Sequence, residues 1–204
     1  MIAIVDYGMG NRRSGEKALE HVGAQPLLTT DQAAMRAADG LVVPGVGAFP
    51  EAMRRLRAAG LDELIRERAE AGVPVLGLCL GMQLLFDSST EHEGATGLSL
   101  LPGTVTALRA PRIPHIGWNL VTFRRPSPLT EGLGEATAFY HVHSLVPEPA
   151  LEDDIVGLGD YDGSFVSIVE RDNVMGVQFH PEKSSRDGLA LLRNFARLCS
   201  KVAA

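Results

Sequence analysis

Short apolar runs alternate with longer amphipathic segments along the first two-fifths of the chain. Residues 2–5, 41–43 and 73–78 are continuous apolar runs without polar alternation, which is typical of strands buried on both faces. Between them, residues 12–22 and 49–71 carry apolar side chains near helical spacing, with arginine and glutamate on the other positions. Strands and helices that alternate in this way predict a parallel sheet with right-handed crossovers.

The pattern changes after about residue 100, where short apolar runs are separated by the turn residues Gly, Pro, Asp and Asn. These runs predict a largely antiparallel extension of the sheet. An apolar stripe over 185–199 predicts a closing helix, which Ser184 can cap three residues before Asp187. We therefore expect residues 1–204 to form one α/β domain, with a mostly parallel central sheet flanked by helices. The antiparallel runs are 103–108, 116–123, 137–142, 155–159, 164–169 and 174–179.

The composition is that of an ordinary globular protein, with 45% hydrophobic and 22% charged residues. The net charge of −6 argues against binding to nucleic acid or to an anionic membrane, and no apolar run has the length of a bilayer span. Residues 1–6 have the pattern of a first strand rather than of a signal peptide, so we expect a cytoplasmic protein. Reduced thiols are the default there, and Cys199 is expected to be a small apolar side chain of the last helix.

The other cysteine, Cys79, lies in the segment Gly77-Leu78-Cys79-Leu80-Gly81, between the run 73–78 and a helical run over 82–86. This is the glycine–x–nucleophile–x–glycine elbow, with cysteine in place of serine. Its flanking glycines let the backbone pass through a tight, strained turn. The sulfur then lies where open α/β sheets bind ligands, at a helix N-terminus that favours a thiolate, and the Leu80 N–H is a candidate oxyanion donor. A buried structural cysteine is the alternative.

A cysteine nucleophile in such a turn needs a histidine base, held in the correct tautomer by a carboxylate. His180 ends an apolar run and is followed two residues later by Glu182. In an extended segment both side chains project to the same face, and Pro181 between them restricts the backbone of both. By itself the pattern is explained equally well by a solvated turn before a helix. Together with the elbow it predicts a triad of Cys79, His180 and Glu182.

The segment Pro44-Gly45-Val46-Gly47 follows the buried run 41–43. Glycine on each side of Val46 lets this backbone rotate and present an N–H to a ligand at the carboxyl edge of the sheet. Taken alone, the segment is explained more simply as an ordinary turn between a strand and a helix. Its position on an earlier strand of the same sheet fits a second oxyanion donor.

Taken together, these segments resemble the class I (triad) glutamine amidotransferases. The resemblance covers essentially the whole chain and implies a flavodoxin-like α/β fold, glutamine as the substrate and no cofactor. Within that family the chain is similar to the glutaminase subunits of imidazole glycerol phosphate synthase, an enzyme of histidine biosynthesis. The narrower resemblance rests on Asp6–Asn11, His115–Asn119, Tyr140–Ser144 and Glu182–Ser184.

The resemblance also implies a set of residues around the substrate. No cluster in the sequence has metal-ligand spacing, so we expect no metal site. For His143, and for His141 on the same strand face, an ordinary hydrogen-bonded histidine is an alternative to a functional role. The residues that the resemblance places near glutamine are Gly47, Gln83, His143 and Ser144.

The implied partner is a cyclase subunit of (β/α)₈-barrel form, which receives ammonia across the interface of a heterodimer. The resemblance places Asn11, Trp118 and Lys183 at that interface, although Trp118 has the pattern of a half-buried core aromatic as well. The chain departs from the family pattern at Arg12 and Gly15, where apolar residues are usual. An arginine facing the core would have to extend its charged end to water, and Gly15 weakens the helix by up to about 1 kcal/mol.

The predicted reaction is hydrolysis of glutamine to glutamate and ammonia, which the partner uses to make imidazole glycerol phosphate and an aminoimidazole carboxamide ribotide. Two alternatives differ in function. One is the glutaminase component of another ammonia-using synthase, making anthranilate, pyridoxal phosphate or a nucleotide, which Gly117-Trp118-Asn119 disfavours. The other is a non-catalytic subunit that has kept the fold, against which the intact Cys79, His180 and Glu182 argue.

Overall fold

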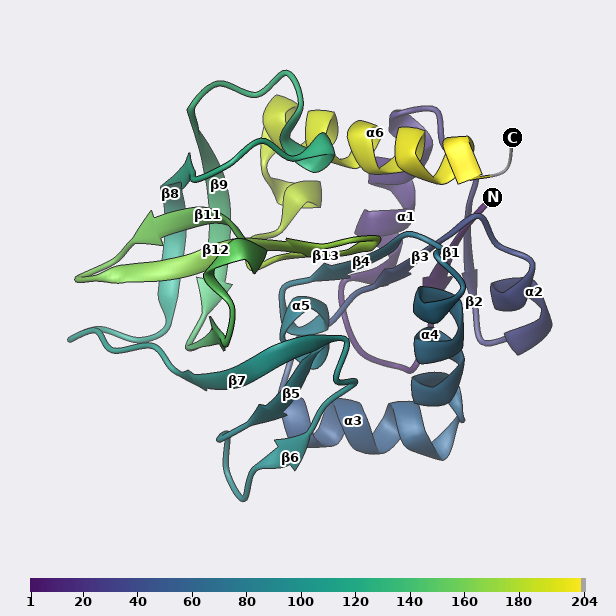
Figure 1. Ribbon diagram of the computed structural model, residues 1–204, viewed down its shortest axis with the longest axis horizontal. Helices are drawn as coiled ribbons and strands as arrows, with labels where there is room; N and C mark the ends of the chain where they lie inside the picture. The colour runs from purple at the N-terminus through teal and green to yellow at the C-terminus, as the bar shows by residue number, and fades with distance from the viewer. Residues whose placement is uncertain (203–204) are drawn as a thin grey trace.

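A nine-stranded sheet crosses the computed structural model, which describes residues 1–202 (Figure 1). Its strands are β1 Ile2–Val5, β2 Pro26–Thr29, β3 Gly40–Val43, β4 Val75–Leu78, β8 His115–Phe123, β9 Ala136–His143, β11 Ile155–Asp160, β12 Ser164–Arg171 and β13 Val174–Val177. They lie in the order β2-β1-β3-β4-β13-β12-β11-β8-β9. The half from β2 to β13 is parallel and the half from β13 to β9 is antiparallel. The predicted parallel sheet with an antiparallel extension is confirmed. Of the runs expected in the extension, however, 103–108 lies in another sheet and 174–179 also pairs in parallel with β4.

A second sheet of four strands was not predicted. Its strands are β5 Phe86–Ser89, β6 Ala95–Thr96, β7 Leu101–Ala107 and β10 Leu145–Pro149, in the order β10-β7-β5-β6. The prediction gave β7 alone, because the other strands are short and two of them contain polar or proline residues at most positions. The helical run expected over 82–86 ends earlier than predicted, since Phe86 already belongs to β5.

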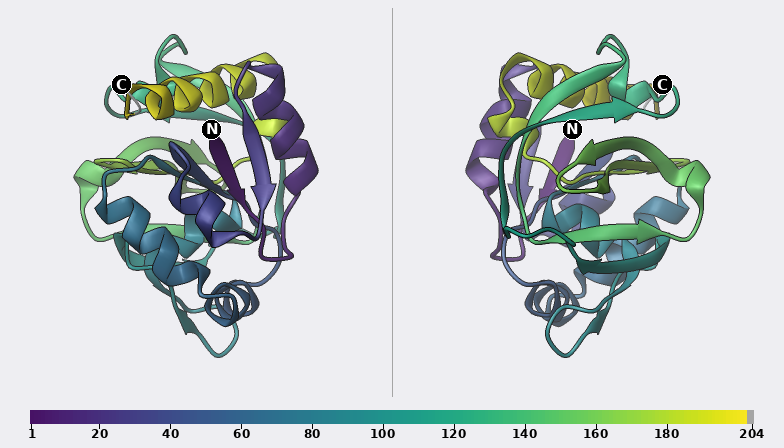
Figure 2. Two further views of the ribbon diagram at one scale, coloured as in Figure 1. Left: turned by 90° about the vertical axis from the view of Figure 1, so that its right-hand side faces the viewer. Right: turned by 90° about the vertical axis from the view of Figure 1, so that its left-hand side faces the viewer.

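Helices cover both faces of the large sheet (Figures 1 and 2). The α-helices are α1 Arg12–His21, α2 Gln32–Arg36, α3 Phe49–Ala58, α4 Leu61–Glu70, α5 Leu80–Leu84 and α6 Ser185–Val202, and the 3₁₀ turns are η1 Pro128–Thr130, η2 Glu152–Asp154 and η3 Pro181–Lys183. One face packs against α1 and α6, and the opposite face against α3, α4 and α5. No helix within residues 1–202 is both long and apolar enough to span a bilayer.

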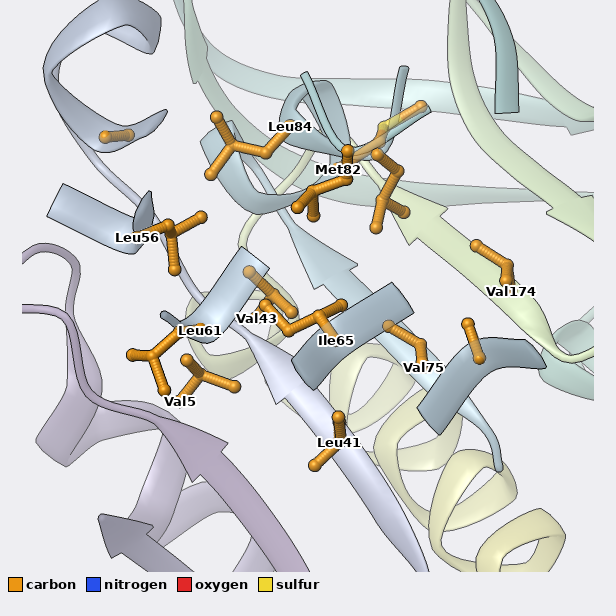
Figure 3. Packing of buried hydrophobic residues seen from close by; sticks show 14 of the residues in the cluster. Val5, Leu41, Val43, Leu56, Leu61, Ile65, Val75, Met82, Leu84 and Val174 are labelled. Carbon is orange, nitrogen blue, oxygen red and sulfur yellow. The ribbon is translucent and has the colours of Figure 1, made fainter. Parts of the chain in front are cut away.

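The core lies on both sides of the parallel strands because alternate residues of each strand point to opposite faces. In β1, Ile2 and Ile4 pack with α1 and α6, whereas Ala3 and Val5 pack with α3 and α4. Figure 3 shows the second of these clusters, in which Val5 lies against Leu61 and other helix residues. All four residues of β1 are buried, as the uninterrupted apolar run predicted.

Two further predictions about the elements were wrong. The helix expected over 49–71 is two helices, α3 and α4, because Gly60 between them has a φ of +63°, a left-handed conformation that glycine adopts readily and that ends a helix. Ser184 was expected to cap α6, but its hydroxyl donates to the His180 carbonyl at 2.7 Å and accepts from the Tyr140 N–H at 2.9 Å. The serine therefore ties the segment before α6 to β9.

Candidate active site

Three neighbouring strands bring the predicted functional segments to one edge of the sheet. β3 and β13 are the two parallel neighbours of β4, so the residues that follow these strands lie side by side at their carboxyl ends. Pro44–Gly47 follows β3, Cys79 follows β4, and Gln178–His180 follow β13. The sheet order, rather than any nearness in sequence, therefore places residue 79 beside residue 180.

The elbow has the geometry that its glycines predict. Cys79 has φ 54° and ψ −112°, a left-handed conformation that non-glycine residues rarely adopt. A β-carbon on Gly81 would lie 1.8 Å from the carbonyl oxygen of Val43, and one on Gly77 would lie 2.6 Å from the carbonyl oxygen of Gly81. Side chains at either glycine would therefore prevent the turn. The Cys79 N–H donates to the Val177 carbonyl at 2.8 Å, which ties the elbow to β13.

His180 and Glu182 form a buried pair beside the sulfur. His180 Nδ1 lies 3.0 Å from Glu182 Oε1, and the two side chains are 5% and 4% exposed. We predicted that both residues would be extended, and this prediction was wrong. Only His180 is extended, and Glu182 reaches back to it from the 3₁₀ turn η3. The hydrogen bond fixes the Nδ1–H tautomer or the imidazolium, and in either case leaves Nε2 for the thiol.

The charge state of His180 depends on three influences. Burial lowers the pKa of the imidazole, but its interactions with the nearby Cys79 and Glu182 raise it, and the net result is a pKa of about 9. The interactions with Cys79 and Glu182 therefore favour the imidazolium form of His180, which can hold a proton taken from the thiol. A protonated imidazole beside Cys79 stabilises a sulfur anion, so the pair is prepared for nucleophilic attack.

A cavity of about 320 Å³ lies over the sulfur. It holds every residue that we predicted for the oxyanion hole and for glutamine binding, together with Cys79, His180 and Lys183. The other residues of its wall, to which the sequence analysis gave no role, are Glu91, Pro114, Val142 and Leu145. They lie in or beside β5, β8, β9 and β10, which come together only in the folded chain. The predicted residues that line it are Val46, Gly47, Leu80, Gln83, His143 and Ser144.

The segment of Val46 and Gly47 is held at one end and exposed at the other. The Tyr7 hydroxyl donates to the Pro44 carbonyl at 2.5 Å, and a β-carbon on Gly45 would lie 2.8 Å from Leu80 Cβ. Beyond this contact the chain opens to solvent, because Val46 is 44% exposed. Burial, and then the nearby Cys79, raise the pKa of Tyr7, so its hydroxyl remains a donor at neutral pH.

Three further histidines form a buried layer behind the cavity. Burial lowers the pKa of His115, and lowers those of His141 to about 3 and of His143 to about 4, so all three are neutral at neutral pH. His141 faces Ser167 at 2.9 Å and His143 lines the cavity. No group of His, Cys, Asp and Glu within the described residues has the geometry to hold a metal ion.

Of the predicted interface residues, Lys183 lines the cavity, whereas Asn11 and Trp118 lie outside its wall. Asn11 Nδ2 donates to Glu182 Oε1 at 3.4 Å, and Lys183 is an exposed residue of the cavity wall. Trp118 is 55% exposed, which excludes the half-buried core position. Arg12 does not enter the core, because its guanidinium forms an ion pair with Asp6.

Comparison with known proteins gives one consistent result. The family model described as glutamine amidotransferase class-I matches residues 3–199. The chain is 50% identical over 198 residues to an imidazole glycerol phosphate synthase subunit HisH of Moorella thermoacetica, covering 97% of this chain and 94% of that protein. It is 47% identical over 201 residues to the subunit of the same name from Aquifex aeolicus, covering 98% and 97%.

Solved structures support the same fold. A crystal structure of glutamine amidotransferase has a TM-score of 0.76 with 21% identity and covers 98% of both chains. A structure of PurLQS from Thermotoga maritima has a TM-score of 0.77 with 19% identity and covers 96% of this chain and 97% of that one. At such identities these likenesses describe the fold alone.

Proposed function

The chain belongs to the class-I glutamine amidotransferase family, and we propose that it releases ammonia from glutamine with Cys79 as the nucleophile and His180 as the base. It acts as the amidotransferase subunit of imidazole glycerol phosphate synthase in histidine biosynthesis, since relatives with that name are 50% and 47% identical over nearly the full length of both chains. These identities also decide against the anthranilate, pyridoxal phosphate and nucleotide synthases that the motifs left open.

The proposed mechanism follows from where each group lies. The Cys79 thiol gives its proton to His180 and the sulfur attacks the γ-carboxamide carbon of glutamine, with the oxyanion held by the Val46 and Leu80 N–H groups. His180 then protonates the departing amine, so ammonia leaves and a γ-glutamyl thioester remains. Water, deprotonated by His180, hydrolyses the thioester to glutamate. Glu182 stabilises the imidazolium throughout, as its 3.0 Å contact with Nδ1 allows.

The single observation that best supports this role is the buried contact of 3.0 Å between His180 and Glu182, with His180 lining the same cavity as Cys79. Gly47, Gln83, His143 and Ser144 line the same cavity and are proposed to hold the substrate. Substitution of Cys79 by alanine is expected to abolish glutamine hydrolysis. Glutamate release by the Cys79→Ala variant at the wild-type rate would refute the mechanism.

We further propose that the partner is a cyclase of (β/α)₈-barrel form, which docks over the cavity mouth. An exposed apolar face lies beside that mouth: Ile116, Trp118 and Leu120 are 59%, 55% and 57% exposed on one face of β8. Val142, which lines the cavity, pairs directly with Ile116. A partner seated on this face, near Asn11 and Lys183, would receive ammonia without its release into solvent.

Coupling between the subunits is tested by steady-state glutamine hydrolysis with and without the cyclase and its ribotide ligand. We expect slow turnover by the isolated chain and a large increase in the loaded complex. The reason is that, in this proposal, the exposed Val46 segment completes the oxyanion hole only after the partner has bound. Equal turnover in both conditions would exclude this coupling, while leaving the chemistry of Cys79 unaffected.

A further inference from the structure

Gln178 is a buried polar residue for which the triad mechanism has no role. It follows β13 directly, and the register Val177 with Leu78 places it next to Cys79 across the two parallel strands. Its side chain is 0% exposed. A fully buried amide is costly unless both its ends are hydrogen-bonded, so the partners of Gln178 are informative.

Both ends of the Gln178 side-chain amide have partners in the active site. Oε1 accepts from Gln83 Nε2 at 3.0 Å, and Nε2 donates to Cys79 Sγ at 3.7 Å. The sulfur has a second polar neighbour, because its thiol donates to the Val142 carbonyl, also at 3.7 Å. Cys79 Sγ therefore lies between one donor, Gln178 Nε2, and one acceptor, the Val142 oxygen.

The orientation of these amides follows from a backbone carbonyl. The Leu145 oxygen can only accept, and Gln83 Nε2 lies 3.3 Å from it, so the amino group of Gln83 must face that oxygen. The same amino group contacts Gln178, which must then present its oxygen to Gln83 and its own amino group to the sulfur. The carbonyl of Leu145 thus decides which end of the Gln178 amide faces Cys79.

The same Leu145 oxygen also accepts a hydrogen bond from the neutral His143, which is linked in turn to a second neutral histidine, His115. His143 Nδ1 lies 3.0 Å from the Leu145 oxygen and must donate to it, which leaves His143 Nε2 to accept from His115 Nδ1 at 2.9 Å. His115 Nε2 then accepts from Asn119 at 3.3 Å, and Asn119 also donates to the Asp160 carbonyl at 2.7 Å. The Leu145 oxygen therefore accepts from both His143 and Gln83, and each donor and acceptor in this chain of hydrogen bonds has one assignment.

We propose that Gln178 is a positioning residue that holds the Cys79 sulfur and favours its ionised form. A neutral thiol donates to the Val142 carbonyl, but once its proton has moved to His180 the sulfur can only accept. The Gln178 N–H then makes a charge-assisted hydrogen bond to the anion, which is stronger than its bond to the neutral thiol. This inference rests on the proposed role of Cys79 as the nucleophile.

The test is the rate at which iodoacetamide alkylates Cys79 as a function of pH, with peptide mapping to separate it from Cys199. Gln178→Met keeps the length of the side chain and removes the donor, and we expect alkylation at neutral pH to slow about tenfold, with the acid limb of the rate profile moved to higher pH. Gln178→Glu places a carboxylate against the sulfur and should slow it further.

Other titratable groups also face this part of the site, and they are unchanged in all of these variants. They are Tyr7, Glu91, His143, His180, Glu182 and Lys183. The matched control is Ser167→Ala, which removes the equally buried hydrogen bond to His141 at 2.9 Å without touching the sulfur. It should leave the alkylation profile at the wild-type values.

Wild-type alkylation profiles for both Gln178→Met and Gln178→Glu would show that Gln178 only fills space, and would overturn the inference. If neither variant folds, the side-chain amide NMR resonances of Gln178 in the wild-type protein distinguish a positioning role from one of filling space. They should shift over the same pH range in which the alkylation rate rises, and constant resonances would overturn the inference. A failure here is distinct from failure of the proposed function, which Cys79→Ala tests separately.

Discussion

The backbone of Cys79, at φ 54° and ψ −112°, is the main source of strain at the residue scale. A side chain in such a conformation costs about 1–3 kcal/mol, and the sequence shows why it persists. The glycines at 77 and 81 make the turn possible, because a β-carbon on either would collide with backbone atoms. The elbow and its strain were predictable from five residues, since they are a local property of the chain.

Replacement of Cys79 separates this strain from the chemistry. Glycine adopts positive φ without cost, so we expect Cys79→Gly to have a free energy of unfolding about 1 kcal/mol higher than Cys79→Ala. Both variants lack the sulfur and serve as each other's control. Urea unfolding followed by circular dichroism measures the difference, and an alanine variant as stable as the glycine variant would contradict the strain.

The network around Gln178 was not predictable at this scale. Its members, Gln83, Gln178 and His143, lie far apart in sequence and meet only through the order of β4, β13 and β9. Of these, Gln83 and His143 were expected near the substrate by resemblance alone. Gln178 carries no signal of its own, because a polar residue at the end of an apolar run is usually the beginning of a loop.

At the scale of single elements, α1 has one glycine inside it and another just after it, and the two differ in backbone conformation. Gly15 lies inside the helix and Gly23 follows it, and a β-carbon on either would meet no atom within 4 Å. Only Gly23 has a positive φ, of +85°. The departure at Gly15 from the family pattern is therefore an unfilled position and not a site that requires glycine.

Alanine at these two positions should have opposite effects. Gly15→Ala is expected to raise the free energy of unfolding by about 1 kcal/mol, because alanine favours the helix and restricts the unfolded chain. Gly23→Ala is expected to lower it by a similar amount or more, because alanine is strained at that φ. Chemical denaturation of the two variants is the measurement, and a change of the same sign in both would refute this explanation.

The histidine layer formed by β8 and β9 gives the protein a predictable acid sensitivity. His141 and His143 have folded-state pKa values of about 3 and 4, below the ordinary 6.5, and burial is the first cause of both shifts. Between these values and 6.5 the unfolded chain binds more protons than the folded one. Stability from these groups is therefore fully present above about pH 6.5 and is lost as the pH falls.

We expect the free energy of unfolding to decrease by about 1.4 kcal/mol per pH unit for each of these histidines as the pH falls from about 6 towards 4. Urea unfolding at several pH values measures the slope. His92 is an exposed control, with 65% of its side chain accessible, and His92→Gln should leave the slope unchanged. In His141→Gln the free energy of unfolding should fall less steeply with pH than in the wild type, when each is referred to its own value at neutral pH. A flat wild-type profile would contradict the buried, neutral state.

The elements that hydrophobic pattern predicted well are those with long or uninterrupted apolar runs, such as β1, β3 and β4. The break between α3 and α4 was missed because apolar spacing continues across Gly60, so that only the conformation of one glycine marks it. The second sheet was missed for a different reason. β5 and β6 are short and gain stability only from pairing with β7 and with each other, which no local pattern records.

At the scale of the whole molecule, an exposed apolar face lies beside the active-site cavity. Trp118 packs its ring edge against Tyr140, with centroids 6.2 Å apart, and neither Ile116 nor Leu120 is covered by another part of the described chain. An apolar face of this kind is typical of a protein–protein interface. The resemblance places Trp118 at a partner interface and assigns no such role to Ile116 and Leu120, which share its face.

Charged substitutions on this face should weaken assembly without affecting the fold. We expect Trp118→Asp and Leu120→Asp each to lower the affinity for the cyclase at least about tenfold, measured by titration calorimetry. Leu151→Asp is the matched control, because Leu151 is similarly exposed, at 49%, but lies next to the second sheet. Equal loss of affinity in all three variants, or in none, would argue against this face as the docking site.

The central claim is that the Cys79 sulfur attacks glutamine after the thiol has passed its proton to His180. Its most direct test is covalent labelling of the assembled enzyme by the glutamine-like electrophile 6-diazo-5-oxo-L-norleucine, followed by peptide mass spectrometry. We predict an adduct on Cys79 and none on Cys199, forming at least about a hundredfold more slowly in His180→Ala. An adduct on another residue, or labelling of Cys79 at an unchanged rate without His180, would contradict the account.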